Sequence, residues 1–341
     1  RPLAPMTEKD KEDARKVYAM VTNIDDNFGK VLKKLDDLNI ADNTIIIFMT
    51  DNGPQQTRYV GGMRGRKGDV YQGGVRVPFY MRYPSSFEKN KDIETTATHI
   101  DVLPTLAQLC NVELPNETLI DGKNLLPLIN NEKVDWADRS LFFYWTRRYP
   151  ELYYNMSLLK GDYKLVGKAN YNATMDDFEL FNLKNDPYEQ HNIVLDKKII
   201  AKRLKEELDV TYNELIASEN LNNKPRIIIG STYENPVVLN RNDAGGERGI
   251  WAQEEIYGKW NVSIEKGYYD IKFKFIKPVK GNGRMYLEAN NMVKQIRNKN
   301  DNTDIIEMKN VYFPKMDGDL IPFYSIGSKN IFPFWVEMTR K

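Results

Sequence analysis

The sequence has one cysteine and two histidines among its 341 residues. A single cysteine, Cys110, excludes an internal disulfide and a zinc site built from cysteines. Because Cys110 ends the apolar, helix-like run "PTLAQLC", we expect it to be a small core residue. The two histidines, His99 and His191, are too few and too far apart in the sequence to indicate a multi-histidine transition-metal site.

The sequence also lacks a charge imbalance and a long apolar run. Its 49 lysines and arginines nearly cancel its 48 aspartates and glutamates, so the net charge gives no reason to expect nucleic acid or an anionic membrane as a partner. No apolar stretch is long enough to span a bilayer, so we predict no membrane span. The hydrophobic fraction of 41% and the charged fraction of 28% are those of an ordinary globular protein, and the length suggests about two domains.

Helix-like and strand-like segments alternate in residues 1–138, as in an α/β domain. The capping-box pattern Thr7-Glu8-Lys9-Asp10 opens a predicted helix whose apolar residues recur every three or four positions. The run "TIIIFMT" at 44–50 predicts a parallel strand covered on both faces, 75–84 predicts a second strand, and 99–110 predicts another helix. These strands are too few for a doubly wound sheet, and the sequence begins with neither an initiator methionine nor a signal-peptide pattern. We therefore expect the missing strands to lie in upstream sequence.

The sequence changes character at about residue 139. Residues 139–222 contain short strand patterns joined by Gly-Asp and Asn-Asp-Pro turns, and they end in an amphipathic helix. Residues 223–341 follow a polar linker and show short alternating strands with no helical pattern. We therefore expect three parts: the end of an α/β core, a small antiparallel subdomain, and an all-β sandwich domain.

The glycine-rich stretch "TDNGPQQTRYVGGMRGRKGDVYQGG" contains the candidate site. Asp51 and Asn52 follow the first predicted strand, at the strand end where ligands of α/β sheets gather. Their hard oxygen donors suit Ca²⁺ or Mg²⁺ rather than zinc, although a simple turn is the alternative. Lys67, which is flanked by glycines, offers a compact positive charge to an oxyanion, and a solvated basic loop is the alternative.

Several segments resemble, in family order, the sulfatases of the alkaline phosphatase superfamily. They are "YAMVTNIDDNFGKVLKKLDDLNIADNTIIIFMTDNG", "MRGRKGDVYQGGVRVPF", "HIDVLPTLAQL", "LLKGDYKLV" and "ELFNLKNDPYEQHNI", and they cover roughly residues 10–195. A later segment, "NPVVLNRNDAGGERGIWAQ", resembles the β-sandwich attached to some bacterial polysaccharide sulfatases. The resemblance implies the C-terminal part of a bacterial-type arylsulfatase or polysaccharide sulfatase. The implied fold is an incomplete alkaline-phosphatase-like α/β fold with a small antiparallel C-terminal subdomain.

The resemblance implies roles for three residues. Asp51 and Asn52 are implied calcium ligands, with Mg²⁺ as the less favoured ion, and Lys67 is the implied catalytic residue that contacts the sulfate. The family nucleophile is a formylglycine made in a Cys/Ser-x-Pro/Ala-x-Arg motif, which this sequence does not contain. We therefore expect the nucleophile upstream, in an N-terminal part of the same sulfatase, and we expect this chain alone to be inactive. The implied substrate is a sulfated glycan or an aryl sulfate, and the implied location is periplasmic or extracellular.

Weaker candidates lie around this site and in the sandwich. Arg64, His99 and Arg147 are candidates for substrate binding, with surface solvation or a structural role as the alternatives. Trp251 and Trp260 are candidates for stacking on sugar rings, although most such aromatics are core residues.

Two other functions remain open at this point. One is a phosphate-ester hydrolase of the same superfamily, which the small number of histidines disfavours. The other is a non-catalytic glycan-binding protein built on a degenerate sulfatase scaffold. The upstream sequence would distinguish the second from an enzyme, because an intact nucleophile motif indicates catalysis.

Overall fold

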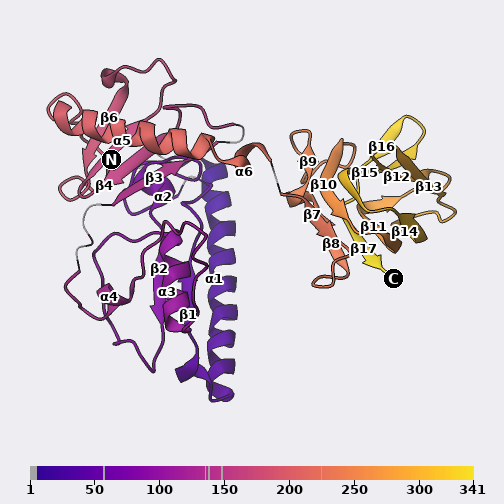
Figure 1. The fold of residues 1–341 in the computed structure, drawn as a ribbon, viewed down its shortest axis with the longest axis horizontal. Coiled ribbons are helices and arrows are strands. Elements are labelled where there is room, and N and C mark those ends of the chain that lie inside the picture. The colour runs from indigo at the N-terminus through magenta and orange to yellow at the C-terminus, as the bar shows by residue number, and fades with distance from the viewer. Residues whose placement is uncertain (1–5, 57, 135, 137–138, 147–148, 224) are drawn as a thin grey trace. The chain divides into compact units, whose positions relative to one another are not determined.

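The computed structural model describes residues 6–56, 58–134, 136, 139–146, 149–223 and 225–341. The chain divides into two compact units, Arg1–Ala217 and Ser218–Lys341 (Figure 1). The boundary predicted at 138/139 falls inside the first unit, and the one predicted at 222/223 falls inside the second. Among the described residues, no helix combines the length and the apolar character needed to cross a membrane.

The first long helix, α1 (Glu8–Asp37), begins at the predicted capping box. The Thr7 hydroxyl oxygen accepts the backbone N–H of Asp10 at 3.1 Å, and the Asp10 carboxylate accepts the backbone N–H of Thr7 at 3.1 Å. The bond to the Asp10 N–H satisfies one of the donors that the first turn of a helix leaves unpaired. The predicted start of this helix is confirmed.

The apolar stripe of α1 is only partly covered by the described residues. Phe28 packs on Phe48 of the adjacent strand, with ring centroids 5.5 Å apart. Val21, Ile24 and Val31 belong to the same stripe and are 49%, 53% and 55% exposed. Contiguous exposed apolar surface of this kind commonly marks an interaction surface.

The strands β1 (Ile46–Met49) and β2 (Phe79–Arg82) pair with each other in antiparallel orientation. Both predicted strands are confirmed. The expectation of a parallel strand buried on both faces is wrong for the described residues, because β1 has β2 as its only neighbour there and is half-buried throughout. The register places Met49 opposite Phe79, so the end of β1 lies beside the start of β2.

Short helical elements connect and follow these strands. They are η1 (Ala41–Asn43), α2 (Gln72–Val75), η2 (His99–Asp101), α3 (Val102–Leu109) and α4 (Leu126–Ile129). η2 and α3 confirm the helix predicted at 99–110. Cys110 caps the end of α3 and is exposed, so the expectation of a core cysteine is wrong. The buried face of α3 carries Thr105 and Ala107 instead.

A four-stranded antiparallel sheet follows, as predicted for this part of the chain. Its strands, in spatial order, are β3 (Ser140–Tyr144), β4 (Met156–Lys160), β5 (Tyr163–Gly167) and β6 (Phe178–Asn182). The short η3 (Met175–Asp177) leads into β6, and the helix α5 (Lys198–Ile216) lies across the sheet (Figure 1).

Both faces of the β3–β6 sheet are covered. One face packs against α5 through a cluster that includes Leu158, Leu165, Leu180, Leu204 and Leu208. On the opposite face, Val166 and Phe181 pack on Val70 and Tyr71 of the glycine-rich stretch. The sheet therefore supports a helix on one side and the candidate-site loop on the other.

The second unit is a β-sandwich, as predicted. One sheet has the order β13-β12-β15-β10-β7, with β16 paired to β15 and β9 to β10, and the other has the order β14-β11-β17-β8. The bounds are β7 (Ile227–Ile229), β8 (Val237–Asn240), β9 (Gly245–Gly246), β10 (Gly258–Ile264), β11 (Gly267–Val279), β12 (Arg284–Ala289), β13 (Met292–Arg297), β14 (Thr303–Phe313), β15 (Met316–Ile326), β16 (Lys329–Ile331) and β17 (Trp335–Arg340). The helices α6 (Glu219–Asn222) and η4 (Arg241–Asp243) complete the unit.

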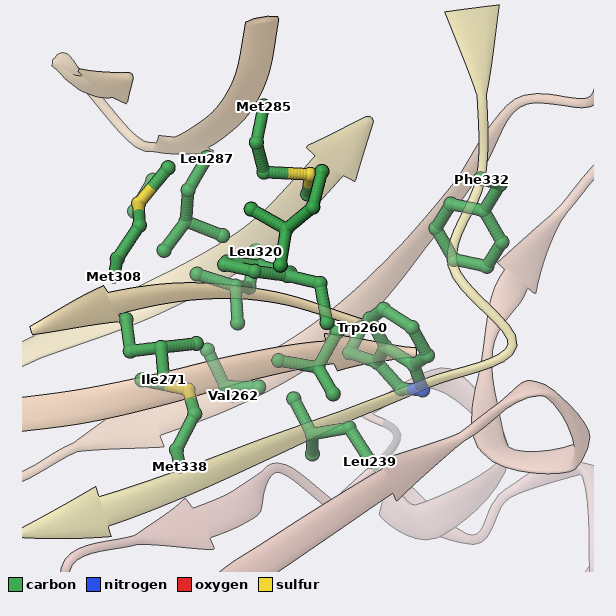
Figure 2. Close-up of a cluster of buried hydrophobic side chains, with 14 of the residues drawn as sticks. Leu239, Trp260, Val262, Ile271, Met285, Leu287, Met308, Leu320, Phe332 and Met338 are labelled. Carbon is green, nitrogen blue, oxygen red and sulfur yellow. The ribbon is translucent and has the colours of Figure 1, made fainter. Parts of the chain in front are cut away.

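The sandwich core decides between the two roles weighed for Trp260. Figure 2 shows Trp260 among the apolar side chains that meet between the sheets. Its ring stacks on Phe332 with centroids 4.8 Å apart, its Nε1–H donates to the Asn240 carbonyl at 2.8 Å, and the residue is 0% exposed. The prediction that Trp260 stacks on a sugar is therefore wrong. Trp251 is 55% exposed, and its sugar contact stays a prediction.

Asp101, the last residue of η2, is a buried acid that ties several segments together. Its two carboxylate oxygens accept from Arg139 at 2.6 and 2.5 Å, and they also accept the backbone N–H groups of Thr98 and Lys123. Burial alone would raise the pKa of Asp101, but these donors hold it below its ordinary value. The folded chain thus stabilises the ionised carboxylate.

We predict that Asp101→Asn lowers the free energy of unfolding of the first unit by about 3–5 kcal/mol at neutral pH, because Arg139 then loses its buried counter-ion. The difference from the unsubstituted chain should shrink as the pH falls below about 3.9, the ordinary aspartate pKa. There the unfolded Asp101 takes up a proton that the folded residue does not bind. Urea denaturation followed by helical circular dichroism measures the loss, since α1 and α5 lie in this unit.

The matched control is Asp37→Asn, which removes an exposed ion pair with Lys33 on α1. Exposed pairs of this type contribute about 0.5 kcal/mol or less. Equal losses in the two variants would contradict the stabilising role of Asp101.

Candidate active site

The turn after β1 presents two oxygen donors. Asp51 is exposed and Asn52 is half-buried. One oxygen of the Asp51 carboxylate accepts the Asn52 backbone N–H at 2.9 Å, and the Asn52 side-chain amide donates to the Gly53 carbonyl at 2.8 Å. Among the described residues, the Asn52 Oδ1 and the second Asp51 oxygen have no hydrogen-bond partner, so they are available to a ligand.

His99 is hydrogen-bonded to the backbone just before Asp51 and Asn52. Its Nε2 lies 2.8 Å from the carbonyl oxygen of Thr50. Because a carbonyl oxygen only accepts, Nε2 donates this bond, and it joins the start of η2 to the end of β1. The prediction that His99 contacts substrate stays untested, but this contact supports the structural alternative.

Close backbone packing explains the glycines of the stretch. We call residues 64–74 the Lys67 loop. The Gly53 N–H donates to the Gly74 carbonyl at 2.8 Å, and a Cβ on Gly53 would overlap the Gly73 carbonyl oxygen. Here the glycines let one backbone segment lie directly on another.

The same packing brings Lys67 to the turn. Its backbone N–H donates to the Pro54 carbonyl at 2.9 Å, two residues beyond Asn52. The Lys67 side chain is exposed, and within the described ranges its ammonium group forms no ion pair. A fixed backbone and a free ammonium group suit the predicted contact with an oxyanion.

Arg64 is already engaged within the chain. Its guanidinium donates to Glu179 at 2.9 Å and lies 4.0 Å from the centre of the Tyr71 ring. This geometry favours a structural role, and a substrate contact stays a prediction. Arg147, the other arginine proposed for substrate binding, lies outside the described residues.

The β3–β6 sheet holds the Lys67 loop through polar residues that the sequence alone did not single out. Glu179 of β6 accepts from Arg64 and from the Tyr71 hydroxyl. Burial and this carboxylate together raise the pKa of the Tyr71 phenol, so it remains a donor. The available sequence signal was that Glu179 is a polar residue between apolar residues of a strand. Such a pattern predicts a face exposed to solvent as readily as a face covered by a loop.

Three more side chains attach to the middle of the loop. Asn155 donates to the Gly68 carbonyl at 2.7 Å, and Lys168 donates to Asp69 at 2.8 Å. The hydroxyl of Ser157 faces the Val70 carbonyl at 3.4 Å. The sheet therefore fixes the loop on both sides of Lys67.

The donor set at the turn fits one part of a hard-cation site. Asp51 and Asn52 supply oxygen atoms, the ligand type that Ca²⁺ and Mg²⁺ prefer. In the described part of the chain, no group of three or more histidine, cysteine, aspartate or glutamate residues is arranged to hold a metal ion. A complete shell would thus need ligands from elsewhere.

Comparisons with known proteins show what the chain resembles. One family model, described as Sulfatase, matches residues 4–112, and another, described as N-sulphoglucosamine sulphohydrolase, C-terminal, matches residues 66–214. These matches support a C-terminal portion of a sulfatase of the alkaline phosphatase superfamily, as the sequence resemblance predicted, and both end before the sandwich.

Curated relatives agree with the family. The chain is 32% identical over 139 residues to rat steryl-sulfatase, and 32% identical over 196 residues to a sulfatase of Formosa agariphila. It is 29% identical over 200 residues to an N-acetylglucosamine-6-O-sulfatase of Bacteroides thetaiotaomicron. These matches cover 38%, 52% and 56% of this chain but only 24%, 34% and 34% of the relatives. The chain therefore spans about a third or less of their length.

Solved structures show the same fold. The crystal structure of Ps i-CgsB aligns with a TM-score of 0.50 at 25% identity, and its complex with k-i-k-neocarrahexaose aligns with a TM-score of 0.50 at 26% identity. Each alignment covers 61% of this chain and 47% of the solved chain.

We predict that Gly53→Ala loosens the Lys67 loop, because the added methyl group would displace the Gly73 carbonyl. Hydrogen exchange measured by mass spectrometry should show faster amide exchange across residues 64–75 and unchanged exchange in β4–β6. Gly29→Ala is the control, since a Cβ at Gly29 of α1 meets no atom within 4 Å. Unchanged protection of the loop in Gly53→Ala would show that the close backbone contact does not hold it.

Proposed function

We propose that this chain forms part of the active site of a sulfuric ester hydrolase that removes sulfate from a sulfated carbohydrate or an aryl sulfate. The similarity to sulfatases supports the class of reaction. The observation that carries the proposal is the backbone bond from Lys67 to Pro54, which holds the backbone of an exposed lysine beside the turn of Asp51 and Asn52.

Lys67 would stabilise the charge that develops on the sulfate. As the S–O bond breaks, negative charge grows on the sulfate oxygens and on the leaving oxygen. A positive group already held in place meets that charge without reorganising, and removing such a group typically costs on the order of 10²–10³ in rate. The attachment of the loop backbone before substrate arrives supports this role.

Asp51 and Asn52 would hold a calcium ion through the carboxylate oxygen and the Oδ1 that their hydrogen bonds leave available. When bound, the ion would supply further positive charge for the sulfate oxygens. Calcium takes about six to eight oxygen ligands, so two residues account for only part of its shell. We infer that the remaining ligands come from an upstream part of the same protein.

The upstream part would also supply the nucleophile, a formylglycine, and cover the open apolar stripe of α1. Burying Val21, Ile24 and Val31 there would give that part a hydrophobic interface with this chain. The 341-residue chain alone should then hydrolyse no sulfate ester. The bacterial relatives support a location in the periplasm or outside the cell.

A sulfated sugar is the favoured substrate class. One relative is named an N-acetylglucosamine-6-O-sulfatase, and one solved relative with the same fold carries an oligosaccharide. Steryl-sulfatase among the relatives keeps a non-sugar sulfate ester possible within the same reaction class. The exposed Trp251 of the sandwich remains the candidate sugar contact outside the matched region.

We expect Lys67→Ala in the complete protein to lower kcat for an aryl sulfate by about 10²–10³-fold without changing the melting temperature, because the ammonium group contacts solvent and not the core. Steady-state kinetics and thermal denaturation measure the two effects. Lys184→Ala, at an exposed lysine after β6, is the control and should retain full activity. If the activity of Lys67→Ala stayed within a fewfold of that of the unsubstituted enzyme, we would conclude that Lys67 lies in a solvated loop and does not contact the sulfate.

Asp51→Ala in the complete protein should weaken calcium binding by more than about 10-fold. The substitution removes a ligand atom. Even residues that only hydrogen-bond to a metal ligand typically change metal affinity by about 10- to 100-fold when they are mutated. Isothermal titration calorimetry with Ca²⁺ gives the affinity directly, without an activity assay. Asp42→Ala, at an exposed acid before β1, is the matched control. Equal Ca²⁺ affinity in the two variants would exclude Asp51 as a ligand.

A further inference from the structure

A buried ion pair lies beneath the Lys67 loop. Lys164 of β5 and Glu189, in the segment after β6, have side chains that are 1% and 0% exposed and an N–O separation of 2.8 Å. Burial lowers the pKa of the Lys164 ammonium, and Glu189 opposes that change. Because desolvation offsets most of the attraction in such a pair, stability alone is a poor explanation for its presence.

The second oxygen of Glu189 reaches the loop. It accepts the backbone N–H of Gln72 at 2.6 Å, at the point where the Lys67 loop enters α2. Lys164 occupies the other oxygen. The lysine therefore makes it possible for a carboxylate to sit fully buried and face the loop backbone.

Glu189 supplies one of several attachments that hold the loop on both sides of Lys67. Before Lys67, Arg64 donates to Glu179. Directly after Lys67, the Gly68 carbonyl accepts from Asn155. Further along the loop, the backbone N–H of Gln72 donates to Glu189. Among the described residues, Lys67 itself contributes its backbone bond to Pro54 and no ion pair. Its position thus depends on contacts made by its neighbours.

We propose that Lys164 and Glu189 are a positioning pair, which fixes the Lys67 loop through the Gln72 backbone so that the Lys67 ammonium group meets the sulfate. The proposal rests on the sulfatase function proposed above. Neither residue touches the substrate; the pair acts through the backbone of the loop. A shift of about 1 Å in a group of this kind can cost about 10²-fold in rate.

Two double variants separate positioning from stability. Lys164→Met with Glu189→Gln removes both buried charges and keeps an amide oxygen that can accept from Gln72. Lys164→Met with Glu189→Met removes the charges and the acceptor together. Replacing a buried ion pair with neutral side chains of similar volume is often neutral or stabilising, so both variants should fold.

Hydrogen exchange on the 341-residue chain is the first measurement. We expect the Gln72 amide to exchange roughly tenfold faster in the double variant with Glu189→Met than in the one with Glu189→Gln, which matches the loss of one hydrogen bond. Glu207→Gln is the control, because Glu207 of α5 pairs with Lys160, the last residue of β4 in the same sheet, and none of its contacts among the described residues is with the loop. Equal protection of Gln72 in the two double variants would overturn the proposal.

Kinetics of the complete protein are the second measurement. Positioning predicts that kcat for an aryl sulfate falls by about 10²-fold only in the variant that lacks the acceptor, while its Ca²⁺ affinity is unchanged. Equal kcat values per folded molecule in the two double variants would show that Lys164 and Glu189 have only a structural role. If the unsubstituted protein hydrolysed no sulfate ester, the proposed function would fail, but hydrogen exchange would still decide whether the pair holds the loop.

Discussion

The candidate site depends on a backbone contact that only glycine permits. The turn after β1 and the Lys67 loop touch where Gly53 meets Gly73 and Gly74, and a side chain at Gly53 would separate them. This contact joins the two implied metal ligands to the implied sulfate contact, which are otherwise separated by a long stretch of sequence. Most of the remaining structure of the first unit can be understood as holding the two sides of this contact in place.

The β3–β6 sheet holds one of those sides because it is buried on both faces. Its apolar residues pack on α5, whereas the residues between them meet the loop. That second face combines Val166 and Phe181 with the polar groups of Lys164 and Glu179. Apolar packing supplies the contact area, and the hydrogen bonds, which need particular distances and angles, fix where the loop backbone lies.

The sequence predicted what local patterns determine. Short motifs and periodicities of a few residues predicted the Thr7 cap, the strands, the antiparallel sheet and the sandwich. Trp260 also carried a readable signal, since it alternates with Val262 and Ile264 on one face of β10, and we misinterpreted it. Contacts such as His99 with Thr50 and Glu189 with Gln72 join distant segments, and no local pattern specifies them. The direction of the strand that pairs with β1 was unpredictable for the same reason.

The loop also keeps Lys67 from being neutralised by its own neighbours. Asp69 is two residues away and would be the natural partner of a free ammonium group. One oxygen of Asp69 instead accepts from Lys168 at 2.8 Å, and the other accepts the backbone N–H of Arg66 at 3.2 Å. Because both oxygens of Asp69 are occupied in this way, the exposed Lys67 forms no ion pair among the described residues and keeps its positive charge, as an anion-binding group requires.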